Sequence, residues 1–304
     1  MDKALIILNP WAGRGHAGER RHDLDLALER AGVDYDMVMT HTRGGAIEMA
    51  RQAVERGYGA IVAVGGDGTV NEAVNGIKLA EAGSGRRVPL GIIPLGTGCD
   101  FIKVLDGFMA NDIYGSVQHI ARWQTRTVDL GLVRVDNELE RWFINALGSG
   151  FDAQAAAEAL KITRLKGFAV YLLAIIRAMA NYKAHPMTIE FDGRRIQRRL
   201  LFASIANGRY QAGGFLLTPD ARIDDGYFDA CLVDNLRIDE IIRHIPKVLE
   251  GTHTRLRQVT MARVRHVAIS SSAPIPVATD GEVLSTRART VTAELIPGAI
   301  EILA

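Results

Sequence analysis

The stretch Ala60-Ile61-Val62-Ala63-Val64 is wholly apolar, and it runs directly into Gly65-Gly66-Asp67-Gly68-Thr69-Val70-Asn71-Glu72. A short apolar run of this kind predicts a strand that is buried on both faces. Val70, Ala73, Val74 and Ile77 follow at the i, i+3, i+4, i+7 spacing of an amphipathic helix. A buried strand, a glycine turn and a helix in this order are typical of α/β proteins with a parallel sheet.

The same alternation extends to both sides of this stretch. Three further strands are predicted at Ala4–Leu8, Tyr35–Thr40 and Leu90–Ile93, and helical spacing is found near 19–31, 47–54 and 100–105. The first half therefore predicts a parallel sheet flanked by helices. Ligands in such sheets bind beyond the carboxyl ends of the strands, which is where the glycine turns lie.

The pattern changes after about Arg126, where β-type segments alternate with turns. Asp136-Asn137 and Asp192-Gly193 are typical hairpin turns. Further strands are predicted at 201–206, 227–233, 264–269 and 290–295, and helical insertions near 152–182 and 238–250. The second half therefore predicts an antiparallel, β-rich domain.

Length and composition agree with two ordinary globular domains or one large one. The chain has 304 residues, of which 48% are hydrophobic and 23% charged, and its net charge is +1. This balance gives no reason to expect a nucleic-acid partner. Two cysteines cannot form a disulfide framework, which favours a reducing cytoplasm. The apolar run Ala4–Leu8 is too short for a signal-peptide core, and Gly167–Ile176 is too short for a membrane-spanning helix.

The glycine turn at 65–68 is the strongest sign of chemistry in the sequence. Three glycines among four residues let the backbone approach a polyphosphate and expose its amides, and the following helix adds a positive N-terminal end. Asp67 is placed to orient a metal–nucleotide complex, while Thr69 and Asn71 are placed to bond phosphate or ribose oxygens. The alternative is that Asp67 and Thr69 only cap the helix.

Two other glycine segments follow predicted strands. The segment 9–18, Asn-Pro-Trp-Ala-Gly-Arg-Gly-His-Ala-Gly, contains a formal G-x-G-x-x-G. It is a weak match to a dinucleotide fingerprint for two reasons. Four residues separate the predicted strand from Gly13, whereas the fingerprint turns directly after its strand. The second strand also ends in Thr40-His41, without the acidic residue that would hold a ribose. A phosphate-contacting loop and a flexible turn both remain open. The segment 94–101, Pro-Leu-Gly-Thr-Gly-Cys-Asp-Phe, is expected at the same edge of the sheet.

Two acidic turns lie in the second half, Asp224-Asp225-Gly226 and Asp280-Gly281-Glu282. Asp-Gly pairs are common in hairpin turns. Carboxylates beside turns also bind Mg²⁺ or act as general bases. The residues alone leave these two interpretations open.

Together these segments resemble the diacylglycerol kinase catalytic family, specifically the bacterial soluble lipid kinases. Asn9-Pro10 with its glycine loop, GGDGT-x-N-E at 65–72, PLGT at 94–97 with Asp100-Phe101, and the two acidic turns occur in family order. GGDGT is shared with NAD kinases, whereas PLGT-x-x-DF with a late DGE is more specific to lipid kinases. One departure is Cys99, where the family usually has Asn.

The resemblance implies an N-terminal α/β nucleotide-binding domain of the phosphofructokinase/NAD-kinase type and a C-terminal antiparallel β-sandwich domain. Their expected bounds are 1–127, with 297–304 returning to the first domain, and 128–296. ATP would lie between the domains. The implied activity is transfer of the γ-phosphate of ATP to the hydroxyl of a lipid alcohol such as diacylglycerol, in the cytoplasm or at the inner membrane face.

The resemblance also implies the site residues. The catalytic base maps onto Asp280 or Glu282, and a structural Mg²⁺ site onto Asp225 with the backbone carbonyls of Arg222 and Tyr227. The ATP contacts map onto the loops at the strand ends, namely Asn9, Pro10, Gly13, Thr40, Gly65, Gly66, Asp67, Gly68, Thr69, Val70, Asn71 and Thr97.

Other functions and partners remain open beside the lipid kinase. One alternative is a kinase for NAD or another small alcohol, and a second is a nucleotide-binding regulatory protein without catalysis. A homodimer and a transient contact with a membrane surface are also left open. For the membrane contact, the candidate is the apolar helix at 168–179, bordered by Lys161, Arg164, Lys166 and Lys183, which is equally typical of packed core.

Overall fold

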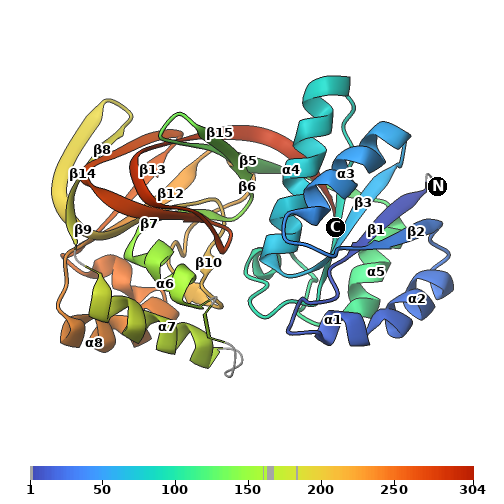
Figure 1. The fold of residues 1–304 in the computed structure, drawn as a ribbon, viewed down its shortest axis with the longest axis horizontal. Coiled ribbons are helices and arrows are strands. Elements are labelled where there is room, and N and C mark those ends of the chain that lie inside the picture. Colours follow the sequence, from blue (N-terminus) through green and yellow to red (C-terminus); the bar gives the residue numbers. More distant parts are fainter. Residues whose placement is uncertain (1–2, 160, 163–167, 183) are drawn as a thin grey trace. The chain divides into compact units, whose positions relative to one another are not determined.

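The computed structural model describes residues 3–159, 161–162, 168–182 and 184–304 of the chain (Figure 1). The chain divides into two compact units. The first unit comprises Met1–Val128 and Gly298–Ala304, and the second comprises Asp129–Pro297. Among the described residues, no helix is long and apolar enough to cross a membrane.

The first unit is built on a parallel sheet of buried strands. These are β1 (Ala4–Leu8), β2 (Tyr35–Met39), β3 (Ala60–Gly65) and β4 (Leu90–Pro94), in the order β2-β1-β3-β4. The end of β15 (Glu282–Leu303) joins beside β4, where Ile302 pairs with Leu90 in parallel. The chain thus returns to its first unit after completing the second.

Helices cover both faces of this sheet (Figure 1). One face packs against α2 (Arg21–Arg30) and α5 (Ile113–Arg122), through a core that includes Leu24, Leu28, Val117 and Ile120. The other face carries α3 (Gly45–Arg56) and α4 (Asp67–Ser84). The short helices α1 (His16–Glu19) and η1 (Phe101–Val104) follow glycine turns. The predicted α/β class of the first half is confirmed.

The strand order determines where a ligand is expected. The chain passes from β1 to β2 on one side and then to β3 on the other, so the order reverses at β1. In open parallel sheets, ligands bind at the carboxyl ends of the strands at such a reversal. The loops that follow β1 and β3 are the segments beginning at Asn9 and Gly66.

The second unit is antiparallel. Its strands follow the order β13-β12-β9-β7-β14-β15-β5-β6, and β8 pairs with other parts of β9 and β14. Their bounds are β5 (Thr125–Val135), β6 (Leu139–Phe143), β7 (Ala146–Gly150), β8 (His185–Phe191), β9 (Arg194–Ala206), β12 (Phe228–Asp234), β13 (Val259–Val264) and β14 (His266–Thr279). A small separate pair comprises β10 (Tyr210–Gln211) and β11 (Phe215–Leu216).

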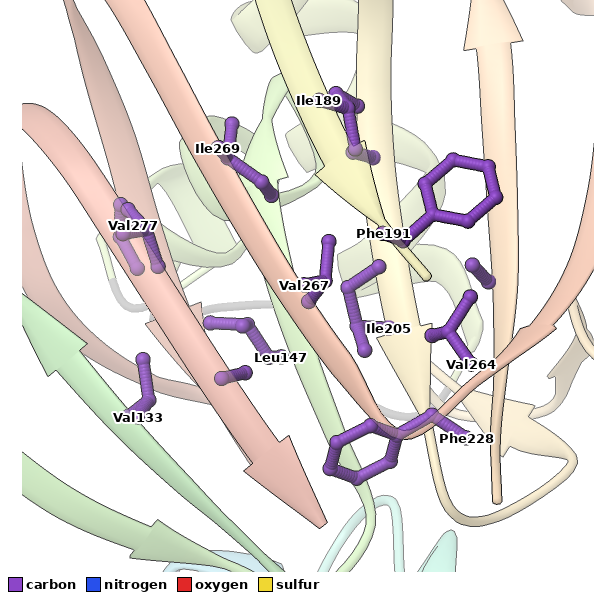
Figure 2. Packing of buried hydrophobic residues seen from close by; sticks show 14 of the residues in the cluster. Val133, Leu147, Ile189, Phe191, Ile205, Phe228, Val264, Val267, Ile269 and Val277 are labelled. Carbon is purple, nitrogen blue, oxygen red and sulfur yellow. The ribbon is translucent and has the colours of Figure 1, made fainter. Parts of the chain in front are cut away.

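The antiparallel sheet folds over on itself. Phe143 ends β6 and Phe228 begins β12, two strands far apart in the strand order, yet their rings stack at 5.4 Å. Side chains from both layers fill the space between them (Figure 2), including Val133, Leu147, Ile205, Val267 and Val277. The predicted β-sandwich is confirmed, and the predicted hairpin turns lie between β5 and β6 and between β8 and β9.

In the described part of this unit, three helices pack on an outer face of the sheet. They are α6 (Phe151–Ala159), α7 (Phe168–Asn181) and α8 (Ile238–Leu249), and η2 (Thr252–Arg255) follows α8. Leu201, Cys231 and Val233 form a second core cluster, against which Ile175 of α7 and Ile241 of α8 also pack. The single helical insertion predicted near 152–182 is therefore two helices.

An acidic side chain at the start of α6 makes stability depend on pH. Burial of the Asp152 carboxyl raises its pKa to about 7, against about 3.9 in an unfolded chain. Between these two values the folded state therefore binds more protons than the unfolded chain. Burial of Asp152 leaves the free energy of unfolding unchanged below about pH 4, lowers it as the pH rises, and has its full destabilising effect above about pH 7. We expect Asp152→Asn to stabilise the protein above pH 7, by on the order of 4 kcal/mol, and to change little below pH 4. Thermal melts of both proteins across this range test this.

Candidate active site

Three loops meet at the carboxyl edge of the first unit's sheet. The Asn9 N–H donates to the carbonyl oxygen of Val64, and the Leu95 N–H donates to that of Gly65. A Cβ added to Gly96 would lie 2.3 Å from the Cα of Gly66. The loops after β1, β3 and β4 are thus in backbone contact, and only glycine fits at position 96.

Two side chains fasten the first loop to helix α4. The Asn9 Nδ2 donates to the Thr69 Oγ1 at 3.0 Å, and the Asn9 Oδ1 accepts from the Trp11 N–H at 3.1 Å. Thr69 is buried beneath this contact. A Cβ on Gly65 would lie 2.5 Å from the same hydroxyl, which explains the glycine there. The roles that the structure shows for Asn9 and Thr69 are in positioning the loops.

Helix α4 begins without a side-chain cap. Gly66 occupies the N-cap position, and Asp67 is the first helical residue. The Asp67 Oδ1 accepts from the Phe101 N–H at 3.2 Å and so ties this loop to the one after β4. Neither Asp67 nor Thr69 occupies the N-cap position itself. The first N–H groups of a helix have no partner within it, and Gly68 beside them is exposed with open space around its Cα.

The predicted nucleotide contacts separate into exposed and buried residues. Gly68 and Thr97 are exposed, and Pro10, Gly13, Gly66 and Asp67 are half-buried. Thr40, Gly65, Thr69, Val70 and Asn71 are buried. The Asn71 side chain has no exposed area, and its Oδ1 accepts from the Asn75 Nδ2 at 3.2 Å. In this structure it presents no surface to a phosphate or a ribose.

Glu72 has a structural role that the sequence analysis did not assign. Its carboxylate accepts from the Gly44 N–H at 2.8 Å and from the Ala46 N–H at 3.0 Å. It therefore caps the start of α3 from the neighbouring helix. The available signal was that α3 starts at Gly44-Gly45, with no capping side chain of its own.

The structure shows what Cys99 does at the position where the family pattern usually has Asn. Its φ is +47°, in the left-handed region where asparagine is tolerated better than most residues. The thiol is buried, and burial raises its pKa to about 12, so it is neutral at physiological pH. The Cys99 Sγ lies 4.0 Å from the carbonyl oxygen of Gly65. The unusual residue thus keeps the loop conformation with an unreactive side chain.

The DGE turn of the second unit holds Asp280 in a fixed orientation. Asp280 lies between β14 and β15 and is buried, with a φ of +47°. Its carboxylate accepts from three successive backbone N–H groups, at Ile144 (2.9 Å), Asn145 (3.0 Å) and Ala146 (2.8 Å). Its own N–H donates back to the Ala146 carbonyl at 3.0 Å.

Glu282 has a different environment. Its Oε2 lies 2.6 Å from a guanidinium nitrogen of Arg141, and its side chain is 28% exposed. The two carboxylates that the sequence left as alternatives are therefore distinguished. Asp280 is fixed by backbone amides, whereas Glu282 is held by one ion pair.

The turn that cradles Asp280 is itself held by Asn207, which the sequence analysis missed. Asn207 is fully buried, and its Nδ2 donates to the carbonyl oxygens of Asp129 (2.8 Å) and Ile144 (2.9 Å). Its N–H donates to the Asn145 carbonyl at 2.8 Å. The Asp129 Oδ2 in turn accepts from the N–H of Gly226 in the other acidic turn, at 2.7 Å. The Asn207 side chain thus connects the turn around Asp280 with the turn at Gly226, through Asp129.

At the predicted Mg²⁺ site, both carboxylate oxygens of Asp225 have partners within the protein. The Asp225 Oδ1 accepts from the Tyr227 N–H at 3.1 Å, and its Oδ2 lies 2.5 Å from the guanidinium of Arg263. Among the described residues, no group of three or more His, Cys, Asp or Glu side chains is arranged to hold a metal. The assignment of Arg222, Asp225 and Tyr227 as a Mg²⁺ site stays a prediction.

The candidate residues are distributed over the two units. Every predicted nucleotide contact belongs to the first unit, whereas Asp280, Glu282 and the Asp225 turn belong to the second. Within the first unit the loops after β1, β3 and β4 are in backbone contact, and within the second unit Asn207 and Asp129 link the two acidic turns. Of the charges predicted to border the apolar helix, Arg164, Lys166 and Lys183 lie outside the described residues.

Each of the two units corresponds to a known protein family domain. Residues 3–133 match the diacylglycerol kinase catalytic domain, and residues 145–304 match the YegS C-terminal NAD kinase beta sandwich-like domain. Diacylglycerol kinases from Staphylococcus aureus strains bovine RF122 / ET3-1 and JH9 are each 32% identical over 281 residues, which are 92% of this chain and 86% of theirs.

Solved structures show the same fold over the whole chain. A candidate diacylglycerol kinase from Bacillus anthracis str. Sterne is 25% identical, with a TM-score of 0.78, over 99% of this chain and 96% of that one. A second structure from the same organism, at 22% identity, has a TM-score of 0.72 over 99% of this chain and 96% of that one. With its motifs in family order and this relationship along its length, the chain belongs to the diacylglycerol kinase family.

Proposed function

We propose that this chain is a lipid kinase that transfers the γ-phosphate of ATP to the hydroxyl of a lipid alcohol, with diacylglycerol as the leading acceptor. The observation that carries the proposal is the Asp280 carboxylate, held by three backbone amides within the lipid-kinase DGE sequence. The named activity of the Staphylococcus aureus relatives supports diacylglycerol as the acceptor.

The first unit supplies the nucleotide site in this proposal. ATP enters with its Mg²⁺ ion as one substrate, and the phosphates lie against the loop amides and the start of α4. Gly68 lies open at this point, while Asn9, Thr69 and Asp67 keep the loops in place. These contacts supply positioning and neutralise charge, which account for most of the catalysis in phosphoryl transfer.

Asp280 acts as the general base. The acceptor oxygen forms a bond to the γ-phosphorus while the bond from that phosphorus to the β,γ-bridging oxygen breaks, so ADP leaves with the electron pair. The hydroxyl proton passes to the Asp280 carboxylate. Because backbone amides orient this carboxylate before the acceptor arrives, little reorganisation is needed in the transition state.

The test is transfer of radiolabelled γ-phosphate from Mg·ATP to a mixed-micelle panel of diacylglycerol, monoacylglycerol, phosphatidylglycerol, ceramide and sphingosine, run beside NAD. Label in the phosphorylated diacylglycerol is the expected result. Label in NAD alone would replace the lipid kinase by the soluble-alcohol alternative. ATP binding without any labelled product would favour a non-catalytic nucleotide-binding protein.

Asn207 provides a second, independent check on the base. We expect Asn207→Ala to lower kcat by about 10- to 100-fold, because loss of two side-chain bonds releases the turn that orients Asp280. ATP affinity should be unchanged, because the ATP contacts belong to the other unit. Steady-state kinetics and ATP titration measure both. Asn235→Ala, at an exposed position, is the matched control. An equal loss of ATP affinity would instead indicate general unfolding.

A further inference from the structure

Strand β7 of the second unit is accessible at one residue on its helix side. Leu147 points into the core of the sandwich (Figure 2), so the next residue, Gly148, faces the opposite side, toward the helices. Strands β9 and β14 flank Gly148, which pairs there with Ser204 and Ala278. Although it lies between two strands, Gly148 is only half-buried. The helix side of the sheet is therefore accessible at this point.

Two polar side chains from the helices reach this part of β7. A Cβ on Gly148 would lie 2.3 Å from the Asp152 Oδ2, so the Asp152 carboxyl of α6 rests directly on the strand. Tyr182 follows α7, and its hydroxyl would lie 2.9 Å from a Cβ on Gly150. Asp152 and Tyr182 are both half-buried. Glycine at both strand positions leaves room for these polar groups.

A third polar side chain approaches from the neighbouring strand. Ser204 of β9 lies opposite Gly148, and its hydroxyl donates to the Gln211 Oε1 at 2.8 Å. Within the described residues, the Gln211 Nε2 and the Tyr182 hydroxyl are buried atoms without a hydrogen-bond partner. A buried donor without a partner destabilises the folded state. Two of them beside one accessible point of the sheet indicate a ligand that accepts hydrogen bonds.

These donors are connected to the turn that carries the proposed base. The Asn145 N–H donates to the Asp280 Oδ1 at 3.0 Å, and the Asn145 Nδ2 donates to the carbonyl oxygen of Tyr210 at 2.9 Å. Gln211 follows Tyr210 directly. The Asp280 N–H also bonds to β7, two residues before Gly148, and two residues of a strand span about 7 Å. A substrate hydroxyl at Asp280 thus brings the rest of its headgroup toward these donors.

We propose that Gln211 and Tyr182 bind the ester carbonyls of the lipid acceptor and so select an acyl-ester glycerolipid, such as diacylglycerol, over a sphingoid base. This inference rests on the proposed function, because it places the acceptor hydroxyl at Asp280. The ester carbonyls of a diacylglycerol are only a few bonds from its free hydroxyl. One headgroup can therefore reach both the base and these donors.

The chemistry of the free groups selects this acceptor. The Gln211 Nε2 only donates hydrogen bonds, and the Gln211 Oε1 is already bonded to Ser204. A carbonyl oxygen only accepts, whereas the ammonium group of a sphingoid base only donates. Burial raises the pKa of the Asp152 carboxyl to about 7, so its negative charge is partly lost at neutral pH. A charged amine therefore finds neither a free acceptor in Gln211 nor a full counter-charge in Asp152.

The experiment compares an ester acceptor with an ether analogue that has the same free hydroxyl but lacks both carbonyl oxygens. Dioctanoylglycerol and dioctylglycerol are presented in the same mixed micelles with Mg·ATP. We expect the native chain to have a KM for the ester that is about fivefold lower or more. Equal KM values for the ester and the ether would overturn the proposal, as would a preference of the native chain for sphingosine.

Tyr182→Phe tests the hydroxyl without risk to folding. The ring keeps its contact with Phe151, at 5.7 Å between centroids, and only a hydroxyl without a partner in the described residues is lost. The melting temperature should be equal or higher, while KM for the ester rises about fivefold and KM for the ether stays unchanged. Tyr114→Phe, at a position that is 49% exposed in the other unit, is the matched control. A native KM of Tyr182→Phe for the ester would overturn the proposal.

Gln211→Glu replaces the free donor by an acceptor, while the other oxygen can still bond to Ser204. We expect KM for the ester to rise about tenfold and the turnover of sphingosine to increase relative to that of the ester. Gln197→Glu is the matched control, because Gln197 is exposed on β9 of the same unit. An equal rise in KM for the ester and the ether would overturn the carbonyl contact and indicate a general distortion of β10.

Binding measurements separate this inference from the proposed function. The affinity of each protein for dioctanoylglycerol is measured by calorimetry without ATP, so the result does not depend on turnover. If the native chain phosphorylates no lipid, the proposed function fails, whereas weaker binding of the ester by Tyr182→Phe would still support the carbonyl contact. If the native chain phosphorylates diacylglycerol and both variants keep its affinity and KM, the inference alone is overturned.

Discussion

Asp280→Asn is expected to abolish phosphate transfer while ATP binding stays near that of the native chain. The amide has the shape of the carboxylate but cannot accept the acceptor's proton, so a loss of about 10²- to 10⁴-fold in kcat is expected. Each carboxylate oxygen accepts at least one backbone N–H, so the new NH₂ group must face a donor. The variant should therefore also lose about 1–3 kcal/mol of folding stability.

Single-turnover assays, ATP titration and thermal melts together test this expectation. Glu282→Gln is the control, because Glu282 follows Asp280 closely in the sequence but is held by an ion pair with Arg141. It should lose less activity than Asp280→Asn. Retained turnover in Asp280→Asn would remove the base assignment, and an inactive Glu282→Gln beside it would transfer the role to Glu282.

Gly66→Val is expected to eliminate ATP binding. A Cβ at this position would already lie 3.2 Å from the Cα of Gly96, so a branched side chain can extend only into the space beside the loops. In the proposed site that space belongs to the phosphates. Isothermal titration with Mg·ATP should show no binding, while the melting temperature reports any distortion of the loops.

Two alanine substitutions in α4 distinguish a loss of ATP binding from a loss of folding stability. Gly68 and Gly83 both lie in α4, and a Cβ at either meets nothing within 4 Å. Replacing either with alanine should preserve or slightly raise stability, because alanine favours helix by about 1 kcal/mol over glycine. Only Gly68→Ala should weaken ATP binding. Equal affinities in the two variants would move the phosphates away from the start of α4.

The first unit was largely predictable because its strands are buried on both faces. Short apolar runs at Ala4–Leu8 and Ala60–Val64 followed by glycine turns have few other structures available. The predicted hairpin turns of the second unit were also informative, because Asp136, Asn137 and Asp192 adopt the positive φ that such turns require.

Other parts of the second unit gave no local signal. Strand β7 is Ala-Leu-Gly-Ser-Gly, a composition that disfavours strand, and it is held in place by pairing with β9 and β14. The structural role of Asn207 could not be predicted from the sequence for a similar reason. Asn207-Gly208 has the composition of a surface turn, and only the folded chain shows its amide buried between Asp129 and Ile144.

Two polar residues of the segment 65–72 are buried in the structure, and their predicted contacts with a nucleotide stay a prediction. Thr69 and Asn71 have the polar groups that a nucleotide site needs, but the close packing of α4 turns both side chains inward. Sequence spacing predicted that they belong to this edge of the sheet. It could not distinguish a ligand contact from a support, because that depends on the direction each helical residue faces.

The return of β15 to the first unit affects how the protein folds during synthesis. Residues 298–304 pair beside β4, yet the ribosome makes them after the entire second unit. Until then the edge of β4 where Ile302 pairs with Leu90 lacks its neighbour. The first unit therefore cannot complete its sheet before the second unit has been synthesised, and a message truncated shortly before codon 298 would yield a first unit whose sheet lacks this last strand.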